Sequence, residues 1–140
     1  MTRKTLNIKE RRFLGSWVEA TFIEAMEGKI RKALDSYVSD KNIGDEFFGL
    51  SSHHKVDGFK YFIGSLDNSG NLVLPESDYL IVDEVSDAYS IYTELMKEKI
   101  SFKAFFDASL ENDHIPIKIE KYRITKDGYV LFSIEVPVKL

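Results

Sequence analysis

The residues best suited to chemistry in this chain are carboxylates and aromatic side chains at a spacing of two. Glu120 lies two positions before Tyr122, and Trp17 lies two positions before Glu19. If these stretches are strands, each pair presents a carboxylate and a ring from one face, because side chains two positions apart project to the same side. Rings attract a cation through their quadrupole, and a carboxylate neutralises a charge that is otherwise costly to bury. The pattern predicts a cleft for lipophilic, often cationic, aromatic compounds. Its predicted lining residues are Trp17, Glu19, Phe59, Tyr61, Glu120 and Tyr122.

Strand alternation also predicts which way the central pair faces. Glu120 and Tyr122 lie on one face of their strand, and Ile117 and Ile119 lie on the other. We expect the two isoleucines to face the helices, and Glu120 with Tyr122 to line the opposite face. The alternative is a solvated glutamate beside a packed tyrosine.

The other aromatic residues leave their orientation open. Trp17 is either a platform for a ligand or a core residue, because a tryptophan buries so much area. Phe59 and Tyr61 fit either the cleft or the layer under a helix.

Catalysis requires a stricter geometry than binding does. If Glu19 and Glu120 converged on one ligand atom they could activate water, so a hydrolase is the alternative function. His53 and His54 are adjacent on a strand and point to opposite faces, and no His-x-x-x-His spacing occurs, so neither a metal nor a cofactor is expected. Hydrolysis requires both carboxylates to approach one ligand atom, whereas binding requires only one carboxylate near the ligand. An enzyme is therefore the less favoured prediction.

The hydrophobic pattern indicates the elements that must position these residues. Residues 12–20 alternate as a strand does, and an apolar stripe from Phe22 to Tyr37 predicts a helix capped by Thr21. Strands at 47–51 and 59–66 follow, joined by a turn at Asp57-Gly58. The same order restarts with a strand at 78–83 and a second helical stripe, and it ends with strands at 117–123 and 129–136. The second stripe consists of Tyr89, Tyr92, Met96 and Ile100.

The two halves of the chain repeat one order of elements. A shift of 70 residues, from Asp57 to Asp127, places Asp57-Gly58 on Asp127-Gly128. We therefore predict an α+β fold in which two strand-helix-hairpin (βαββ) units, approximately residues 6–70 and 75–140, form one domain over residues 1–140. Their strands should make an antiparallel sheet with two helices on one face and a central cleft.

Composition argues against several classes of function. The net charge of −4, without a long run of Lys and Arg, makes nucleic acid a poor direct partner. No stretch of about 20 apolar residues predicts a membrane span. The chain has no cysteine, which excludes a disulfide framework and a thiol nucleophile and fits a cytoplasmic location.

Four short motifs resemble a known family. They are Phe59-Lys60-Tyr61-Phe62-Ile63-Gly64, the stretch from Pro75 to Tyr79, Ile119-Glu120-Lys121-Tyr122, and Ile134-Glu135-Val136-Pro137-Val138-Lys139. Together they are similar to the GyrI-like small-molecule-binding domain family, which is related to the effector-binding domains of bacterial multidrug-responsive transcription regulators. The resemblance implies that Glu120 and Tyr122 form the acidic-x-tyrosine pattern that precedes the final hairpin. Ile119 stands where an aromatic residue is common in the family.

The resemblance also implies a set of activities. Compact members bind drugs or dyes, inhibit DNA gyrase, or hydrolyse reactive cyclopropane-bearing compounds. No DNA-binding helical segment precedes Leu6, so we expect a stand-alone binding domain and not a complete transcription regulator. Binding or sequestration of small molecules is the leading prediction, and a gyrase inhibitor would act instead through an acidic surface. The acidic residues considered for that surface are Asp83, Glu84, Asp87, Glu111 and Asp113.

Overall fold

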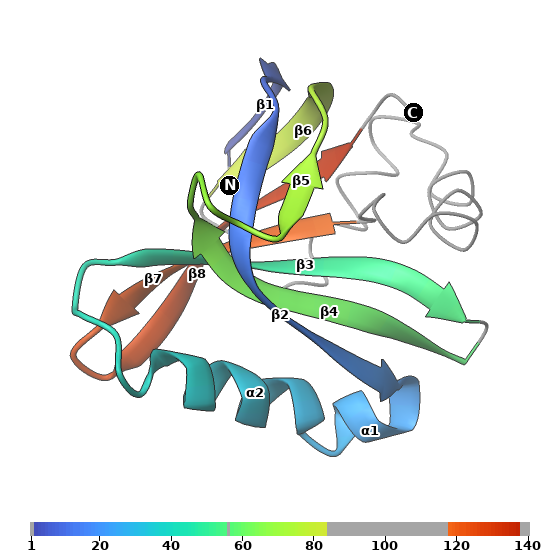
Figure 1. Cartoon of the computed structure of the whole chain (residues 1–140), viewed down its shortest axis with the longest axis vertical. Helices are drawn as coiled ribbons and strands as arrows, with labels where there is room; N and C mark the ends of the chain where they lie inside the picture. The colour runs from blue at the N-terminus through green and yellow to red at the C-terminus, as the bar shows by residue number, and fades with distance from the viewer. Residues whose placement is uncertain (1, 56, 84–117, 138–140) are drawn as a thin grey trace.

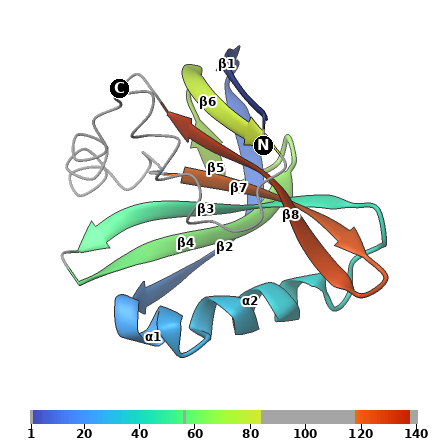
Figure 2. The ribbon, with the colours of Figure 1, turned by 180° about the vertical axis from the view of Figure 1, so that it is seen from behind.

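The computed structural model describes residues 2–55, 57–83 and 118–137, which form a curled antiparallel sheet with two short helices (Figures 1 and 2). The strands are β1 (Thr2–Ile8), β2 (Arg11–Thr21), β3 (Glu46–Lys55), β4 (Gly58–Leu66), β5 (Leu72–Leu74), β6 (Ser77–Asp83), β7 (Lys118–Thr125) and β8 (Gly128–Pro137). The helices are α1 (Phe22–Met26) and α2 (Lys29–Val38). The α+β class agrees with the prediction from the sequence, to which the structure adds β1 and β5.

The sheet closes on itself through one bent, two-stranded ribbon. Its strand order is β1-β6-β8-β7-β3-β4-β2-β5. β1 pairs with β6 up to Ile8 and Ser77, and beyond the bend β2 pairs with β5 from Arg11 and Leu74 in the same register. The chain therefore forms two long bent strands, one made of β1 and β2 and the other of β5 and β6 (Figure 1). They bend together and join the two ends of the sheet. Pro75 lies in the bend, where its missing N–H removes no ladder hydrogen bond.

The apolar stripe of residues 22–37 forms two helices where one was predicted. Thr21 caps α1 as expected, because its Oγ1 accepts the Glu24 N–H (3.1 Å) while Glu24 Oε1 accepts the Thr21 N–H (2.9 Å). Gly28 then adopts φ 94°, a left-handed conformation that glycine tolerates best, and separates α1 from α2. Both helices lie along one face of the sheet (Figure 1).

Both predicted hairpins are present. Lys55 pairs with Gly58, and Thr125 pairs with Gly128. Each glycine thus begins the returning strand. The Asp-Gly signal had instead predicted a glycine at the centre of the turn.

The two faces of the sheet bury separate apolar clusters. One, the sheet core, is built from strand residues, whereas the other, the helix-side core, includes Leu34 of α2. Adjacent residues enter different cores, as with Tyr61 and Phe62 of β4. The buried residues of the sheet core are Phe13, Phe48, Leu50, Phe62, Leu72, Leu74, Tyr79, Ile81 and Ile119. Those of the helix-side core are Leu34, Phe47, Tyr61, Ile63, Tyr122 and Ile124.

Several predictions concern residues outside the described ranges. These are the second helical stripe from Tyr89 to Ile100, the residue Ile117, and most of the acidic surface: Glu84, Asp87, Glu111 and Asp113. Within the described ranges, no helix is long and apolar enough to cross a membrane.

Candidate functional site

The centre of the candidate site is Glu120 of β7, a carboxylate that is only 6% exposed. The Tyr61 hydroxyl donates to Glu120 Oε1 (3.0 Å), and the Tyr122 hydroxyl donates to Glu120 Oε2 (2.8 Å). Each carboxylate oxygen is therefore bound by one neutral phenol. Hydrogen bonds to an ionised acceptor are stronger than those between neutral groups, which helps to offset the desolvation of Glu120.

Gly49 of β3 allows Tyr61 to reach Glu120 across a strand. β3 lies between β4, which carries Tyr61, and β7, where Glu120 pairs with Gly49. A Cβ atom at position 49 would lie 1.7 Å from the Tyr61 hydroxyl oxygen, so no larger residue fits with the tyrosine in this position. The glycine thus provides the space through which the phenol crosses β3.

Further aromatic rings pack around Tyr122, one of the two phenols that bind Glu120. Phe47 stacks on Tyr122, with ring centroids 5.0 Å apart and planes inclined by 14°. Tyr129 meets Tyr122 edge-on at 5.5 Å, and Tyr37 of α2 lies 5.2 Å from Phe47. The aromatic cluster next to the Glu120–Tyr122 hydrogen bond offers π faces, which are favourable for a lipophilic cation.

Burial keeps the two phenols protonated. Desolvation raises the pKa of Tyr61 well above its usual value, and the negative charge of Glu120 raises it further. The pKa of Tyr122 is raised by the same two causes in the same order. Both hydroxyls therefore remain hydrogen-bond donors to Glu120 throughout the neutral pH range.

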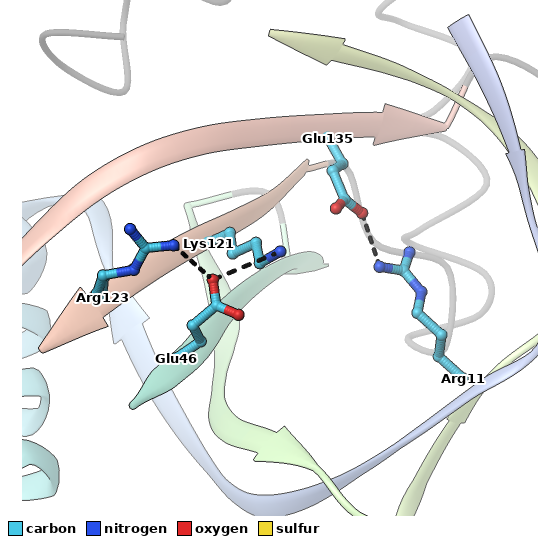
Figure 3. Close-up of polar contacts among 5 residues, drawn as sticks. All are labelled: Arg11, Glu46, Lys121, Arg123 and Glu135. Atoms are coloured by element: carbon cyan, nitrogen blue, oxygen red, sulfur yellow. Dashed lines mark hydrogen bonds and ion pairs between the residues drawn. The ribbon is translucent and has the colours of Figure 1, made fainter. Parts of the chain in front are cut away.

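No cationic side chain compensates Glu120 among the residues that the structure describes. The ion pairs formed by Lys and Arg in these ranges involve other carboxylates, such as those of Glu46 and Glu135 (Figure 3). A buried carboxylate without a counter-charge is unusual, because its desolvation is costly. The site is therefore electrostatically incomplete within these residues.

A second buried glutamate, Glu135 of β8, shows the opposite arrangement. Its Oε1 lies 2.8 Å from Nη1 of Arg11, in an ion pair whose side chains are 13% (Arg11) and 8% (Glu135) exposed (Figure 3). The guanidinium also lies over the rings of Phe13 and Tyr79, at 5.7 and 5.0 Å from their centroids. This pair therefore belongs to the sheet core, and nothing in the local sequence pattern indicated it.

The structure divides the six predicted lining residues into two groups. Phe59, Tyr61, Glu120 and Tyr122 belong to or pack against the helix-side core. Trp17 instead packs against the sheet core, where its ring meets Phe62 edge-on at 5.2 Å and Lys60 Nζ lies 4.7 Å from its centroid.

Glu19 also lies away from the other carboxylate. It is exposed and shares the Trp17 face of β2, because the two residues are two positions apart. Val18, between them, packs in the helix-side core. Glu19 and Glu120 are therefore on opposite faces of the sheet and do not converge.

The predicted orientation of β7 is wrong. Ile119 lies in the sheet core, while Tyr122 shares the helix-side core with Leu34 of α2. Glu120 and Tyr122 thus face the helices, the reverse of the expectation. The reason is that both faces of this curled sheet are buried, so an apolar side chain does not mark the helix-covered face.

One cavity reaches the rings next to the carboxylate. It has a volume of about 320 Å³ and is lined by Phe47, the ring that stacks on Tyr122. The other lining residues are Tyr37, Lys41, Asp45, Glu46, Ser65 and Ile124. The cavity gives the helix-side core an opening at the end of α2.

Among the described residues, no three or more His, Asp or Glu side chains are grouped so that they could hold a metal ion. His53 and His54 lie in β3.

Comparison with models of protein families gives no match for this chain, and no curated protein matches it either. The similarity to GyrI-like domains therefore rests on the motifs quoted above.

Proposed function

We propose that this protein binds lipophilic, often cationic, aromatic small molecules in the helix-side core, with Glu120 as the counter-charge. The observation that carries the proposal is the carboxylate itself, which is 6% exposed, held by two neutral phenols and unpaired with any cation among the described residues. A ligand cation would supply the charge that the site lacks, and the surrounding rings would supply the contact area.

Access to Glu120 in this proposal passes through the rings next to the cavity. Phe47 lines the cavity and stacks on Tyr122, which binds Glu120 directly. A ligand that entered beside Tyr37 and displaced the Phe47 ring would come within reach of the carboxylate. Side chains of both charges, Lys41, Asp45 and Glu46, line the same opening, and Glu46 is paired with Lys121 and Arg123. The preference for a positive ligand in this proposal therefore depends on Glu120.

The finer features of the predicted fold belong to the same proposal. The partner order β3-β4-β2 in the first half corresponds to β7-β8-β6 in the second, and β3 pairs with β7 between them. This correspondence supports a duplicated βαββ unit of the GyrI-like kind with a central ligand site. A cytoplasmic location and a small molecule, not nucleic acid, as the direct partner are further parts of the proposal.

The other activities find less support. Hydrolysis by a pair of carboxylates would need Glu19 near Glu120, and these residues lie on opposite faces of the sheet. Inhibition of DNA gyrase would use an acidic surface of which only Asp83 is among the described residues. No contact among the described residues supports either activity.

The test compares two ligands of nearly the same shape, phenyltrimethylammonium and neutral tert-butylbenzene, by calorimetric titration. We expect Glu120→Gln to weaken phenyltrimethylammonium at least tenfold, about 1.4 kcal/mol, and to leave tert-butylbenzene unchanged. Glu19→Gln is the matched control, because it removes an exposed carboxylate on the other face and should change neither affinity. Equal losses for the two ligands would show that Glu120 does not act through its charge.

A further inference from the structure

A lysine ammonium lies against one of the rings that line the cavity at the end of α2. Lys41 and Tyr37 both line this cavity, and Lys41 Nζ lies 4.7 Å from the centroid of the Tyr37 ring. An ammonium within about 6 Å of a ring centroid is attracted by the π face of that ring. The Tyr37 ring in turn lies 5.2 Å from Phe47, which stacks on Tyr122. A cation of the protein itself therefore lies at the start of the row of rings that ends at Glu120.

The turn after α2 holds Lys41 in this place. α2 ends at Val38, and the Lys41 N–H donates to the Val38 carbonyl (3.1 Å), so the chain continues to turn beyond the helix. Residue 41 thus returns to the side of Tyr37, four positions earlier. The C-terminal end of a helix also favours a cation, because its free carbonyl groups carry partial negative charge. The ring and the helix end both suit a positive charge here, whether it belongs to Lys41 or to a ligand.

The ion pair that Lys41 makes is weak enough to let its ammonium move. Lys41 Nζ lies 3.4 Å from Asp40 Oδ1, and the two side chains are 38% and 78% exposed. Exposed pairs of this kind contribute little to stability, because water and salt screen them. A cation–π contact at an exposed site is also modest in strength. A ligand can therefore displace the ammonium from the Tyr37 ring at a small cost.

We infer that Lys41 is an internal competitor for the ligand cation at the mouth of this cavity. The inference rests on the proposed function, since it concerns the same site and the same ligands. A cation that enters beside Tyr37 must displace the Lys41 ammonium from the ring and is repelled by it, whereas a neutral ligand of the same shape meets no such repulsion. Lys41 therefore weakens the binding of cations, and the attraction of Glu120 favours those that reach it.

Calorimetric titration with phenyltrimethylammonium and tert-butylbenzene tests this role of Lys41. Lys41→Gln removes the competing charge and should strengthen the binding of phenyltrimethylammonium about threefold, the factor that corresponds to a cation–π contact at an exposed site, with tert-butylbenzene unchanged. Lys41→Arg keeps a cation at the ring and should not show the gain. Lys32→Gln is the matched control, because it removes a lysine charge from an exposed position of α2 outside the cavity lining, and it should not show the gain either.

A double substitution separates competition at the ring from a general effect of charge. In a Tyr37→Leu background the ammonium has no ring to occupy, so Lys41→Gln should no longer strengthen the binding of phenyltrimethylammonium. The same gain in that background, or no gain in the otherwise unmodified chain, would overturn the inference.

The titrations also distinguish this inference from the proposed function. If Glu120→Gln weakened phenyltrimethylammonium but Lys41→Gln did not strengthen it, the proposed function would stand and the inference would be wrong. Binding of phenyltrimethylammonium by Lys41→Gln but not by the unmodified chain would support the inference. If neither protein bound this cation, both the proposed function and the inference would be wrong.

Discussion

The described part of the chain contains two buried glutamates on opposite faces of one sheet, and only one of them has a charged partner there. Glu120 and Glu135 are each 6% exposed. Glu135 pairs with the Arg11 guanidinium, whereas Glu120 is held by two phenols that carry no charge. Burial alone therefore does not distinguish a structural carboxylate from a candidate binding carboxylate. What differs between the two among the described residues is the presence of a counter-charge, which Glu135 has and Glu120 lacks.

The largest effect on stability should come from breaking the ion pair between Arg11 and Glu135. Arg11→Met would leave Glu135 buried without its cation and should lower the free energy of unfolding by about 3–5 kcal/mol. Urea denaturation measures this loss. Adding Glu135→Leu should restore much of the stability, because replacing both members of a buried pair by apolar residues is often close to neutral. A small effect of Arg11→Met alone would mean that Glu135 is compensated in another way.

Filling the space at position 49 should cause the next largest loss of stability. Gly49→Ala would place a methyl group where the Tyr61 hydroxyl lies, so the phenol must leave Glu120, at a cost of about 3 kcal/mol in urea denaturation. In a Tyr61→Leu background the same substitution should cost much less, because the ring that it meets is gone. Additive losses in the double variant would contradict the proposed role of Gly49.

Removing one phenol hydroxyl should lower stability less than displacing the whole Tyr61 side chain. Tyr122→Phe keeps the stacking on Phe47 but removes the donor to Glu120 Oε2, and should destabilise the fold by about 2 kcal/mol. Tyr37→Phe is the control, since Tyr37 also packs against Phe47 but makes no hydrogen bond to Glu120. If both substitutions had the same effect, the Tyr122 hydroxyl would not be stabilising the carboxylate.

The smallest effect should appear only in alkaline solution. The pKa values of Tyr61 and Tyr122 are raised in the folded protein, so their contribution is complete below the ordinary pKa of 10.0 and is lost as the pH rises above it. Each tyrosine should add about 1.4 kcal/mol per pH unit to the loss of unfolding free energy above pH 10. Tyr61→Phe should make that decline shallower in urea titrations at successive pH values. An unchanged slope would show that Tyr61 ionises as readily when folded.

Local patterns in the sequence predicted much of the fold but not which way its strands face. The strand at 12–20, the Thr21 cap and both hairpins follow from spacing and turn residues, and they are present. The break at Gly28 was not predicted, because a glycine within an apolar stripe is compatible with a continuous helix. β1 and β5 were missed because neither shows a strong alternation.

The candidate site was predicted only in part for a related reason. Glu120 and Tyr122 could be paired from the sequence because they lie two positions apart in one strand, where the Tyr122 hydroxyl binds Glu120. The approach of Tyr61 across Gly49, and the pairing of Arg11 with Glu135, join residues far apart in the sequence. Which strands become neighbours decides such contacts, and alternation cannot reveal it when both faces of a sheet are apolar.

The bent ribbon also determines when the sheet can be completed during synthesis. β2, β3 and β4 can pair with one another early, but the closed arrangement needs β6 to pair with β8, which contains the last described residues. Until about residue 137 has left the ribosome, the sheet core therefore lacks part of its wall, and Phe13, Phe48 and Phe62 have incomplete cover. Such exposed apolar surface promotes aggregation of partly made chains. The nascent protein is consequently expected to depend on chaperones more than the finished one.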